Sequence, residues 1–354
     1  MNHEYSQRLE RIEKTLAETL PESCSGRWIE ETFSRLPEGV DLPEGIETEH
    51  IRPLVEPCRE LFLRGGKRWR PLLLVLACEL YGGGDRGYRL TPAVEFIHTA
   101  SLIHDDIEDG ADTRRGAPAV HILYGIDTAI TSGSWLFFEA LSCINGFPGG
   151  PETAFRLYRA AAAETRRLHL GQAMDIAWHR DNSRVPSVTE YLSMTRLKTG
   201  TLASLAGKLG VLGAGGTEEE AERFGEIAAG AGVGFQVLDD VLNLTRGNPG
   251  KKRGDDIVEG KKSLPVLFHL DSRPEDFRRI AGYFEAAKRN GIDAPEVEQC
   301  VTLLNESGAV EQAQAYGEGL IRSVCGTLRE RWPGNEAAGL IAGMFEAMTG
   351  EAAR

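Results

Sequence analysis

Leu102-Ile103-His104-Asp105-Asp106-Ile107-Glu108-Asp109 is the most informative stretch of this chain. It follows an apolar segment with helical spacing and places four acids within five positions. Like charges one turn apart destabilise a helix, and partly desolvated carboxylates are costly unless a positive charge compensates them. Because Mg²⁺ prefers carboxylate oxygens as ligands, the stretch predicts a helix end that binds a divalent metal.

A second acidic cluster, Asp239-Asp240-Val241-Leu242-Asn243, lies far along the chain and again follows apolar residues. Asp105 and Asp109 share one face of a helix with about 6 Å of rise between them, and Asp239 and Asn243 repeat that spacing. One cluster alone is explained equally well as a solvated helix end. Two clusters, each behind an apolar segment, favour a site that holds a diphosphate through bridging metals.

The rest of the chain predicts an all-α fold, a single-domain helical bundle around a deep central cavity. Helical patterns with short glycine-containing joints follow one another from about Ile51, and no segment alternates polar and apolar residues long enough for a sheet. We expect residues 1–50 to form an N-terminal helix, up to about residue 20, and a connector rich in Pro, Gly and Glu. This loose segment precedes the main domain, residues 51–354.

Composition excludes several classes of protein. The net charge of −13 argues against a nucleic-acid surface. The longest apolar run, from Pro71 to Cys78, is too short to span a bilayer, and no signal peptide opens the chain, so we expect no stable membrane insertion. The six cysteines form no CxxC pair, which is typical of reduced thiols in a cytoplasmic protein.

Basic clusters stand out against the acidic composition. Lys67 and Arg70 follow a glycine pair and can point together from adjoining turns, a good arrangement for diphosphate oxygens. Standing alone, such a cluster is more commonly a solvated basic loop. Beside two metal sites, separate anion sites indicate two phosphorylated substrates, with an apolar part that enters the cavity. The other clusters are Arg114-Arg115, Lys198-Thr199-Gly200 and the Lys- and Gly-rich segment 251–262, a candidate lid.

Together these segments resemble the trans-isoprenyl diphosphate synthases, the polyprenyl synthetase family, from about Gly65 to Pro265. The two acidic clusters look like the family's two aspartate-rich motifs. The resemblance implies the isoprenoid synthase fold, a homodimer, and head-to-tail condensation of an allylic diphosphate with isopentenyl diphosphate. Further matches, in order, are Gly65–Arg68, Arg114–Gly116, Lys198–Gly200, Phe235–Gln236 and Gly260–Lys261.

The resemblance also implies a role for each matching residue. A cluster of three Mg²⁺ would hold the allylic diphosphate through Asp105, Asp109 and Asp239, with Asp106, Asp240 and Asp256 close by. The leaving diphosphate would be bound by Arg114, Lys198 and Lys261, with Lys251 or Lys252 beside them. Isopentenyl diphosphate would be bound by Lys67, Arg70, His98 and Arg115. The oxygens of Thr199 and Gln236 would stabilise the carbocation.

The resemblance extends to product length. Asn243 stands where many members have Asp, and this departure, like the segment from His169 to Asp175, resembles the eukaryote-type geranylgeranyl diphosphate synthases. Ala100 and Ser101 lie about one turn below Asp105, where farnesyl-length members commonly carry aromatic residues, so the cavity is expected to be open there. Its floor is predicted at Phe137 and Phe138, with His169 beyond, although simple core packing explains the two phenylalanines equally well.

We expect a twenty-carbon product, with longer polyprenyl or farnesyl diphosphate as the alternatives. A class I terpene cyclase would carry Ser or Thr and then Glu in its second motif, where this chain has Asn243 and Gly247. A non-catalytic partner subunit would be expected to lose the acids or the basic site, and this chain has both.

Overall fold

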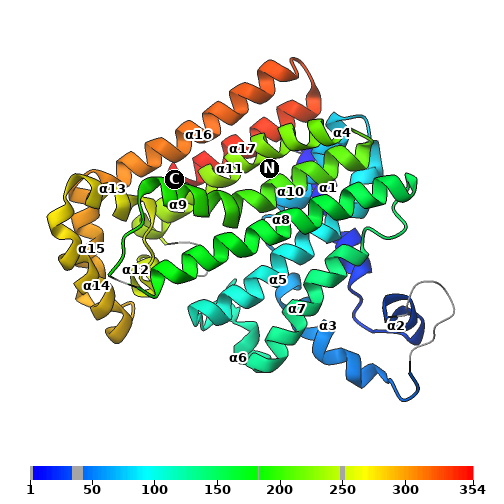
Figure 1. The fold of residues 1–354 in the computed structure, drawn as a ribbon, viewed down its shortest axis with the longest axis horizontal. Helices are drawn as coiled ribbons and strands as arrows, with labels where there is room; N and C mark the ends of the chain where they lie inside the picture. Colours follow the sequence, from blue (N-terminus) through cyan, green and yellow to red (C-terminus); the bar gives the residue numbers. More distant parts are fainter. Residues whose placement is uncertain (1–2, 34–42, 182, 248–251, 354) are drawn as a thin grey trace. The chain divides into compact units, whose positions relative to one another are not determined.

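The computed structural model describes residues 3–33, 43–181, 183–247 and 252–353. Within these ranges the chain is almost entirely helical (Figure 1). The exception is a small antiparallel sheet, in which β1 (Thr113–Arg114) pairs with β2 (Ala117–Pro118). The prediction of an all-α fold is confirmed. The hairpin was not predicted, because two-residue strands leave no alternation of polar and apolar residues to detect.

The chain divides into two compact units. The first contains Met1–Leu72 and Tyr88–Phe147, and the second contains Leu73–Gly87 and Pro148–Arg354. The elements α4 (Trp69–Leu80) and η1 (Gly84–Leu90) cross the division points. The other helices of the first unit are α1 (His3–Thr19), α2 (Gly26–Phe33), α3 (Thr48–Leu63), α5 (Thr91–Asp109), α6 (Val120–Tyr124) and α7 (Ile126–Ser142).

The second unit contains the longer helices. Its elements are α8 (Gly150–His179), α9 (Val188–Thr195), η2 (Arg196–Gly200), α10 (Thr201–Ala214), α11 (Glu218–Thr245), α12 (Asp255–Glu259), α13 (Leu264–Ser272), η3 (Pro274–Asp276), α14 (Phe277–Asn290), α15 (Pro295–Glu306), α16 (Ala309–Arg331) and α17 (Glu336–Ala353). The helix α10 packs against both α8 and α11, and α11 packs against α16 (Figure 1). The element η2 is a π-helical turn between α9 and α10.

The N-terminal helix is part of the first unit, and the prediction of a loose segment is wrong. Ile12, Leu16 and Leu20 repeat every fourth position and are fully or almost fully buried, and α1 packs against α5. The predicted connector contains α2, whose Phe33 ring stacks on Trp135 of α7 with 6.2 Å between centroids. A boundary between residues 50 and 51 stays a prediction.

The helix α5 of the first unit carries the first acidic cluster in its last two turns. Proline lies in its first turn, and Gly110 ends it in the left-handed conformation with φ 65°, its N–H bonded to the carbonyls of Asp106 and Ile107. The helix packs against α7. At Gly133 of α7, an added Cβ would lie 2.8 Å from His104 Nε2 and would displace this side chain, so the close contact with α5 favours glycine there.

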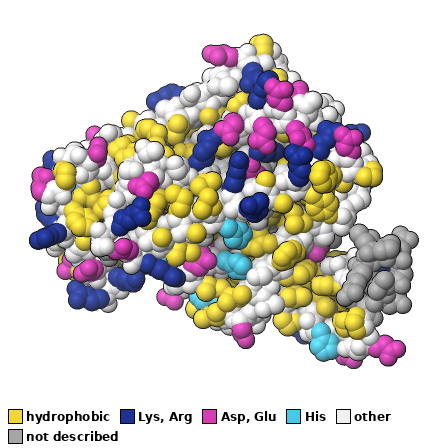
Figure 2. Space-filling view, in the orientation of Figure 1, with side chains coloured by type: hydrophobic (Ala, Val, Ile, Leu, Met, Phe, Trp, Pro, Cys, Tyr) yellow, Lys and Arg dark blue, Asp and Glu magenta, His cyan; other side chains and the backbone are white. Residues whose placement is uncertain are grey.

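The surface carries charges of both signs. On the face drawn in Figure 2, Lys and Arg side chains are interspersed with Asp and Glu, which fits the acidic composition and offers no continuous basic area on that face. No helix in the described ranges combines the length and the apolar composition needed to cross a membrane.

Candidate active site

The first acidic cluster lies at the C-terminal end of α5, where the helix dipole already disfavours negative charge. Arg114 compensates part of that charge. Its Nε donates to Asp106 Oδ1 at 2.6 Å, and its Nη2 lies 3.8 Å from Asp105 Oδ2. Burial raises the pKa of Asp106 while Arg114 opposes the rise. Asp106 is therefore used within the protein, and Asp105 and Asp109 are the better candidates for a metal.

The donor set at this helix end fits a hard cation. The second oxygen of Asp106, Oδ2, is buried and accepts no hydrogen bond from any residue that the structure describes. Within the same residues, no three His, Cys, Asp or Glu side chains are arranged to hold a metal ion by themselves. Mg²⁺ characteristically takes one or two carboxylates and completes its shell with water and substrate phosphates, so an incomplete protein site is what such chemistry needs.

Arg68 and Glu95 form the buried foundation of the basic site in the first unit. Arg68 adopts φ 48°, in the left-handed region, and its side chain is 2 % exposed. It pairs with the buried Glu95 on α5 and donates to Glu13 of α1 at 2.8 Å and to the carbonyl of Phe62 at 2.7 Å. Arg68 is thus committed to the fold, while Lys67 beside it is exposed.

Three of the residues predicted to bind isopentenyl diphosphate meet beside this pair. Arg70 Nη1 lies 3.5 Å from His98 Nε2. The pKa of His98 lies well below its usual value, first because the ring is removed from water and then because Arg70 and Arg115 repel a positive charge. Burial also lowers the pKa of Arg115, opposed by Glu95. Closely grouped arginines around a neutral imidazole make a site suited to an anion.

The turn between β1 and β2 positions Arg115. Its backbone adopts φ 54°, and its guanidinium donates to the carbonyl of Gly65. Gly66 has φ 151°, and a Cβ there would lie 3.1 Å from Arg115 Nη2. Gly66 is favoured by its backbone angle and by the nearby arginine, whereas Gly65 is favoured by its φ of 76° alone.

In the second unit, the π-helical turn η2 places two of the predicted catalytic residues. Lys198 Nζ lies 2.7 Å from Asp175 Oδ2 of α8, and Thr199 Oγ1 donates to Gln236 Oε1 of α11 at 2.8 Å. The turn is held between two close helix contacts. A Cβ on Gly171 would come within 2.4 Å of the Lys198 backbone nitrogen, and one on Gly232 within 2.9 Å of Gly200 Cα. Such π-helical turns occur frequently at functional sites.

In the second acidic cluster, as in the first, one acid is used within the protein and its neighbour is the candidate ligand. Asp240 is 6 % exposed and accepts hydrogen bonds from Tyr191 Oη at 2.6 Å, Gln236 Nε2 at 3.1 Å and the Leu264 N–H at 3.3 Å. Burial raises its pKa to about 6. Asp239, its half-buried neighbour, is the better candidate for a metal ligand.

Asn243 ties the end of α11 to the segment that follows. Its Oδ1 accepts the backbone N–H of Asp256 at 3.3 Å, and its carbonyl accepts the N–H of Gly254 at 3.0 Å. The side chain is fully buried. Its amide nitrogen is buried and has no hydrogen-bond partner among the described residues. The departure from Asp leaves the oxygens of Asp239 and Asp240 unchanged.

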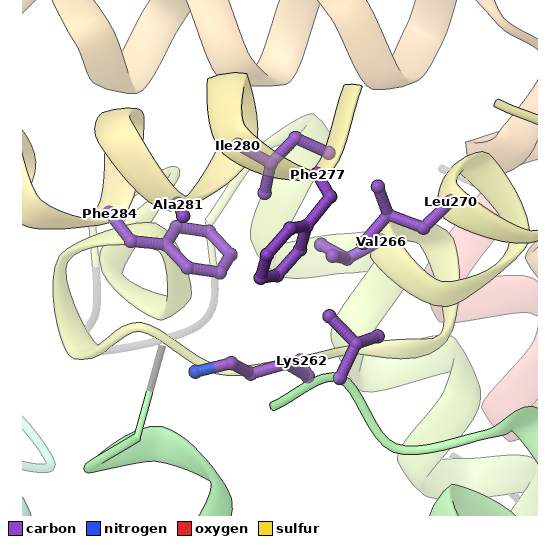
Figure 3. A pocket seen from close by; sticks show the side chains of 8 residues that line it. Lys262, Val266, Leu270, Phe277, Ile280, Ala281 and Phe284 are labelled. Carbon is purple, nitrogen blue, oxygen red and sulfur yellow. The ribbon is translucent and has the colours of Figure 1, made fainter. Parts of the chain in front are cut away.

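The lysines after α12 differ sharply. Lys261 pairs with Glu259 and lies 3.9 Å from Asp256, with a side chain 21 % exposed. Lys262 is buried, donates to the carbonyl of Trp178 at 2.7 Å, and lines the small apolar pocket between α13 and α14 in Figure 3. Burial lowers its pKa to about 8.

The sequence does not decide whether Lys251 or Lys252 contacts the leaving diphosphate. Lys251 lies outside the described residues. Lys252 is exposed and lies 3.5 Å from Asp293.

The residues predicted to control chain length are not equivalent. Ala100 is fully buried, Ser101 is half-buried, and the Phe137 ring lies 5.7 Å from that of His104. Phe138 is 72 % exposed, and His169 on α8 is exposed as well. These last two side chains do not fill the interior of the chain, and only Phe137 remains a candidate for the floor.

Four residues that support the site were given no role from the sequence. Asp175 holds Lys198, Tyr191 holds Asp240, and Glu13 and Glu95 hold Arg68. Asp175 had a detectable signal, because it lies one helical turn after Gly171 in the segment that resembles the geranylgeranyl branch. The other three are single residues within ordinary amphipathic patterns, and no local feature distinguishes them.

Acidic helix ends that can hold a hard cation and grouped arginines within an all-α fold suit a protein that binds phosphorylated ligands. The sequence model of the polyprenyl synthetase family matches residues 51–304. The chain belongs to the polyprenyl synthetase family and is a trans-prenyltransferase, as the resemblance predicted.

Similar proteins and solved structures agree with this family assignment. The chain is 39 % identical over 254 residues to the chloroplastic geranylgeranyl pyrophosphate synthase 9 of Arabidopsis thaliana, covering 68 % of this chain and 70 % of that protein. It is 34 % identical over 266 residues to the geranylfarnesyl diphosphate synthase of Aeropyrum pernix, covering 72 % and 80 %. The crystal structure of the geranylgeranyl pyrophosphate synthetase from Pyrococcus horikoshii matches with a TM-score of 0.78 at 28 % identity, covering 98 % and 95 %.

Proposed function

We propose that this protein condenses an allylic diphosphate head-to-tail with isopentenyl diphosphate and yields geranylgeranyl diphosphate. The match of residues 51–304 to the polyprenyl synthetase family carries this proposal, because that range contains both acidic clusters and every basic motif. The names of the Arabidopsis and archaeal relatives support the twenty-carbon product. The geranylfarnesyl synthase among them keeps a longer product as the alternative.

Asp105, Asp109 and Asp239 are the proposed ligands of Mg²⁺, in a cluster of three ions that carries the allylic diphosphate. When bound, Mg²⁺ supplies positive charge that stabilises the departing diphosphate. Asp106, through Arg114, and Asp240, through Gln236, support these ligands and their neighbours from within the protein. Arg114, Lys198 and Lys261 add fixed positive charge for the leaving group.

Isopentenyl diphosphate is bound by Lys67, Arg70, His98 and Arg115. The lowered pKa values of His98 and Arg115 support this assignment. An anion that enters among these groups would offset the repulsion between their positive charges. Thr199 and Gln236 present oxygen lone pairs to the allylic carbocation, which alkylates the isopentenyl double bond. The proton that is then lost leaves to the released diphosphate, and no side-chain nucleophile takes part.

We also propose that the protein is a homodimer. Ile126, Ile130 and Phe138 follow one face of α7 at intervals of four or eight residues and are 55, 47 and 72 % exposed. Ile122 and Leu123 of α6, a helix that packs against α7, are exposed as well. A second copy would cover this apolar stripe of α7, because exposed apolar patches of this kind mark interaction surfaces. Ile130→Asp should shift the protein toward a monomer in size-exclusion chromatography with light scattering. Ile46→Asp is the control for an exposed isoleucine outside the stripe.

The cytoplasmic location stays a prediction from cysteine usage; all six cysteines are free in the structure.

The reaction is tested by incubating the purified protein with Mg²⁺, labelled isopentenyl diphosphate and, separately, dimethylallyl, geranyl and farnesyl diphosphates. Products are dephosphorylated and sized by chromatography. The Asp105→Asn/Asp239→Asn double variant, purified identically, controls for host synthases. A twenty-carbon alcohol formed only by the native protein is expected.

Other outcomes separate the alternatives. Longer alcohols would support the proposed condensation reaction but show a longer product. A hydrocarbon formed from an allylic diphosphate alone would point to a cyclase. Condensation only after a second chain is added would point to a non-catalytic partner subunit.

A further inference from the structure

A row of hydrogen bonds in the second unit connects a tyrosine of α9 to the predicted catalytic threonine. Tyr191 is 2 % exposed, and its Oη donates to Asp240 Oδ2 at 2.6 Å. Gln236 Nε2 donates to Asp240 Oδ1 at 3.1 Å, and Thr199 Oγ1 donates to Gln236 Oε1 at 2.8 Å. The four side chains come from α9, α11 and η2, so no local sequence pattern joins Tyr191 and Thr199 to the α11 pair, Gln236 and Asp240.

The row has one direction because of the chemistry of its members. An ionised carboxylate only accepts hydrogen bonds, whereas a glutamine amide has a donating end and an accepting end. Asp240 therefore requires the Gln236 NH₂ group to face it, which turns Oε1 toward Thr199. Thr199 must then donate its single hydroxyl proton to Gln236, which leaves its oxygen lone pairs available to other partners.

The carboxylate of Asp240 can impose this order only if it is itself held in one orientation. Tyr191 and the Leu264 N–H both donate to Oδ2, which leaves Oδ1 for Gln236. The hydrogen bond from Tyr191 is the shorter of the two, and of these two it is the one donated by a side chain. Without the Tyr191 hydroxyl, only the longer Leu264 contact remains on Oδ2, so the carboxylate is held less firmly and the Gln236 amide can turn more easily.

We propose that Tyr191 is a positioning residue that orients the oxygens of Thr199 and Gln236 through Asp240. The proposal rests on the proposed function, in which those oxygens face the carbocation. Developing positive charge is stabilised by lone pairs that are already turned toward it, and a threonine whose proton points at the cation would act against the reaction. Tyr191 itself touches no reacting atom, so its loss should slow turnover without weakening substrate binding.

The test is a steady-state comparison of Tyr191→Phe, Thr199→Val and the double variant. Tyr191→Phe keeps the ring within its apolar cluster and removes only the hydroxyl. We expect kcat to fall about tenfold, with the KM of both diphosphates within about twofold of the native values. The double variant should be little slower than Thr199→Val alone, because residues that act through one another are not additive. Tyr283→Phe, a partly buried tyrosine of the same unit, is the matched control and should change nothing.

A native kcat in Tyr191→Phe, or effects of the two substitutions that multiply, would overturn the proposal. If the native protein condenses no substrates at all, the proposed function fails instead, and the two failures are thus distinguished. Replacing Tyr191 with 4-aminophenylalanine, which keeps a donor in place of the hydroxyl, should restore most of kcat. This second variant also carries the test if Tyr191→Phe does not fold, because a folded amino variant with a lowered kcat and no coupling to Thr199→Val would equally contradict the proposal.

Discussion

Lys198 Nζ and Asp175 Oδ2 lie 2.7 Å apart, and this ion pair joins the π-helical turn η2 to the helix α8. Both side chains are mostly buried, with Lys198 21 % and Asp175 12 % exposed. Burial lowers the pKa of His179, one turn further along α8, and the carboxylate of Asp175 partly opposes that shift. The carboxylate thus holds the lysine that we assign to the leaving diphosphate.

We predict that Asp175→Asn lowers kcat/KM for the allylic diphosphate by about tenfold, because Lys198 loses the charge that orients it. The KM for isopentenyl diphosphate should stay near the native value, since its proposed ligands lie elsewhere in the sequence. The measurement is steady-state kinetics with each substrate varied in turn. Asp181→Asn, an exposed carboxylate just after the same helix, is the control. An unchanged kcat/KM would show that Lys198 needs no partner.

Asp105→Asn and Asp239→Asn should each reduce turnover by roughly two orders of magnitude or more at saturating Mg²⁺, while far-UV circular dichroism stays native. Each change removes a charge and keeps the side-chain volume. Chelation should abolish the activity of the native protein, and added Mg²⁺ should restore it. Asp112→Asn, an exposed acid close to the first cluster, serves as the matched variant. Near-native turnover in either aspartate variant would refute the metal assignment.

Arg68→Ala should lower the free energy of unfolding by about 3 kcal/mol or more, because it leaves the buried charge of Glu95 without its partner. Glu13→Gln should cost less than about 1 kcal/mol, since the Glu13 side chain is 47 % exposed and its pair with Arg68 is screened by water. Urea denaturation at constant pH measures both. Equal losses of unfolding free energy in the two variants would contradict the expectation that the buried partner, Glu95, matters more than the exposed one, Glu13.

Glu139 on α7 should make stability depend on pH. Burial raises its pKa from 4.5 to about 7. Between these values the folded chain keeps a proton that the unfolded chain releases, so this group makes the free energy of unfolding fall as the pH rises. Glu139→Gln should therefore gain stability relative to the native protein between about pH 5 and about pH 8, measured by urea denaturation. A constant difference across that range would place the pKa of Glu139 near its ordinary value.

Phe137→Ala should lengthen the product if this residue closes the cavity, because truncation removes the largest part of the proposed floor. Product size by chromatography after dephosphorylation is the readout. Phe155→Ala is the control for an aromatic side chain, since this ring on α8 is 60 % exposed, lies outside the apolar stripe of α7 and should not affect product length. An unchanged product in Phe137→Ala would leave that side chain as ordinary core packing.

Much of this protein follows from local patterns. The spacing of apolar residues predicted the helices, because helix periodicity is carried by neighbours in sequence. The two acidic clusters, the basic motifs and their order predicted the family, which the comparison confirms. The small hairpin, α2 and the packing of α1 were not predicted, because their stability comes from contacts with distant residues such as Trp135 on α7.

What the tertiary structure decided is which of two similar neighbours is available for chemistry. Asp106 and Asp240 are buried and paired inside the protein, as are the cations Arg68 and Lys262. The residue pattern by itself presents each of them as the equal of the residue beside it, Asp105, Asp239, Lys67 and Lys261. The family resemblance favoured these neighbours, and the structure shows the physical reason. Adjacent side chains point in different directions along the backbone, so one member of each pair meets the packed interior and its partners there. Those partners, from Glu95 to Tyr191, come from other helices, and only the folded chain brings them together.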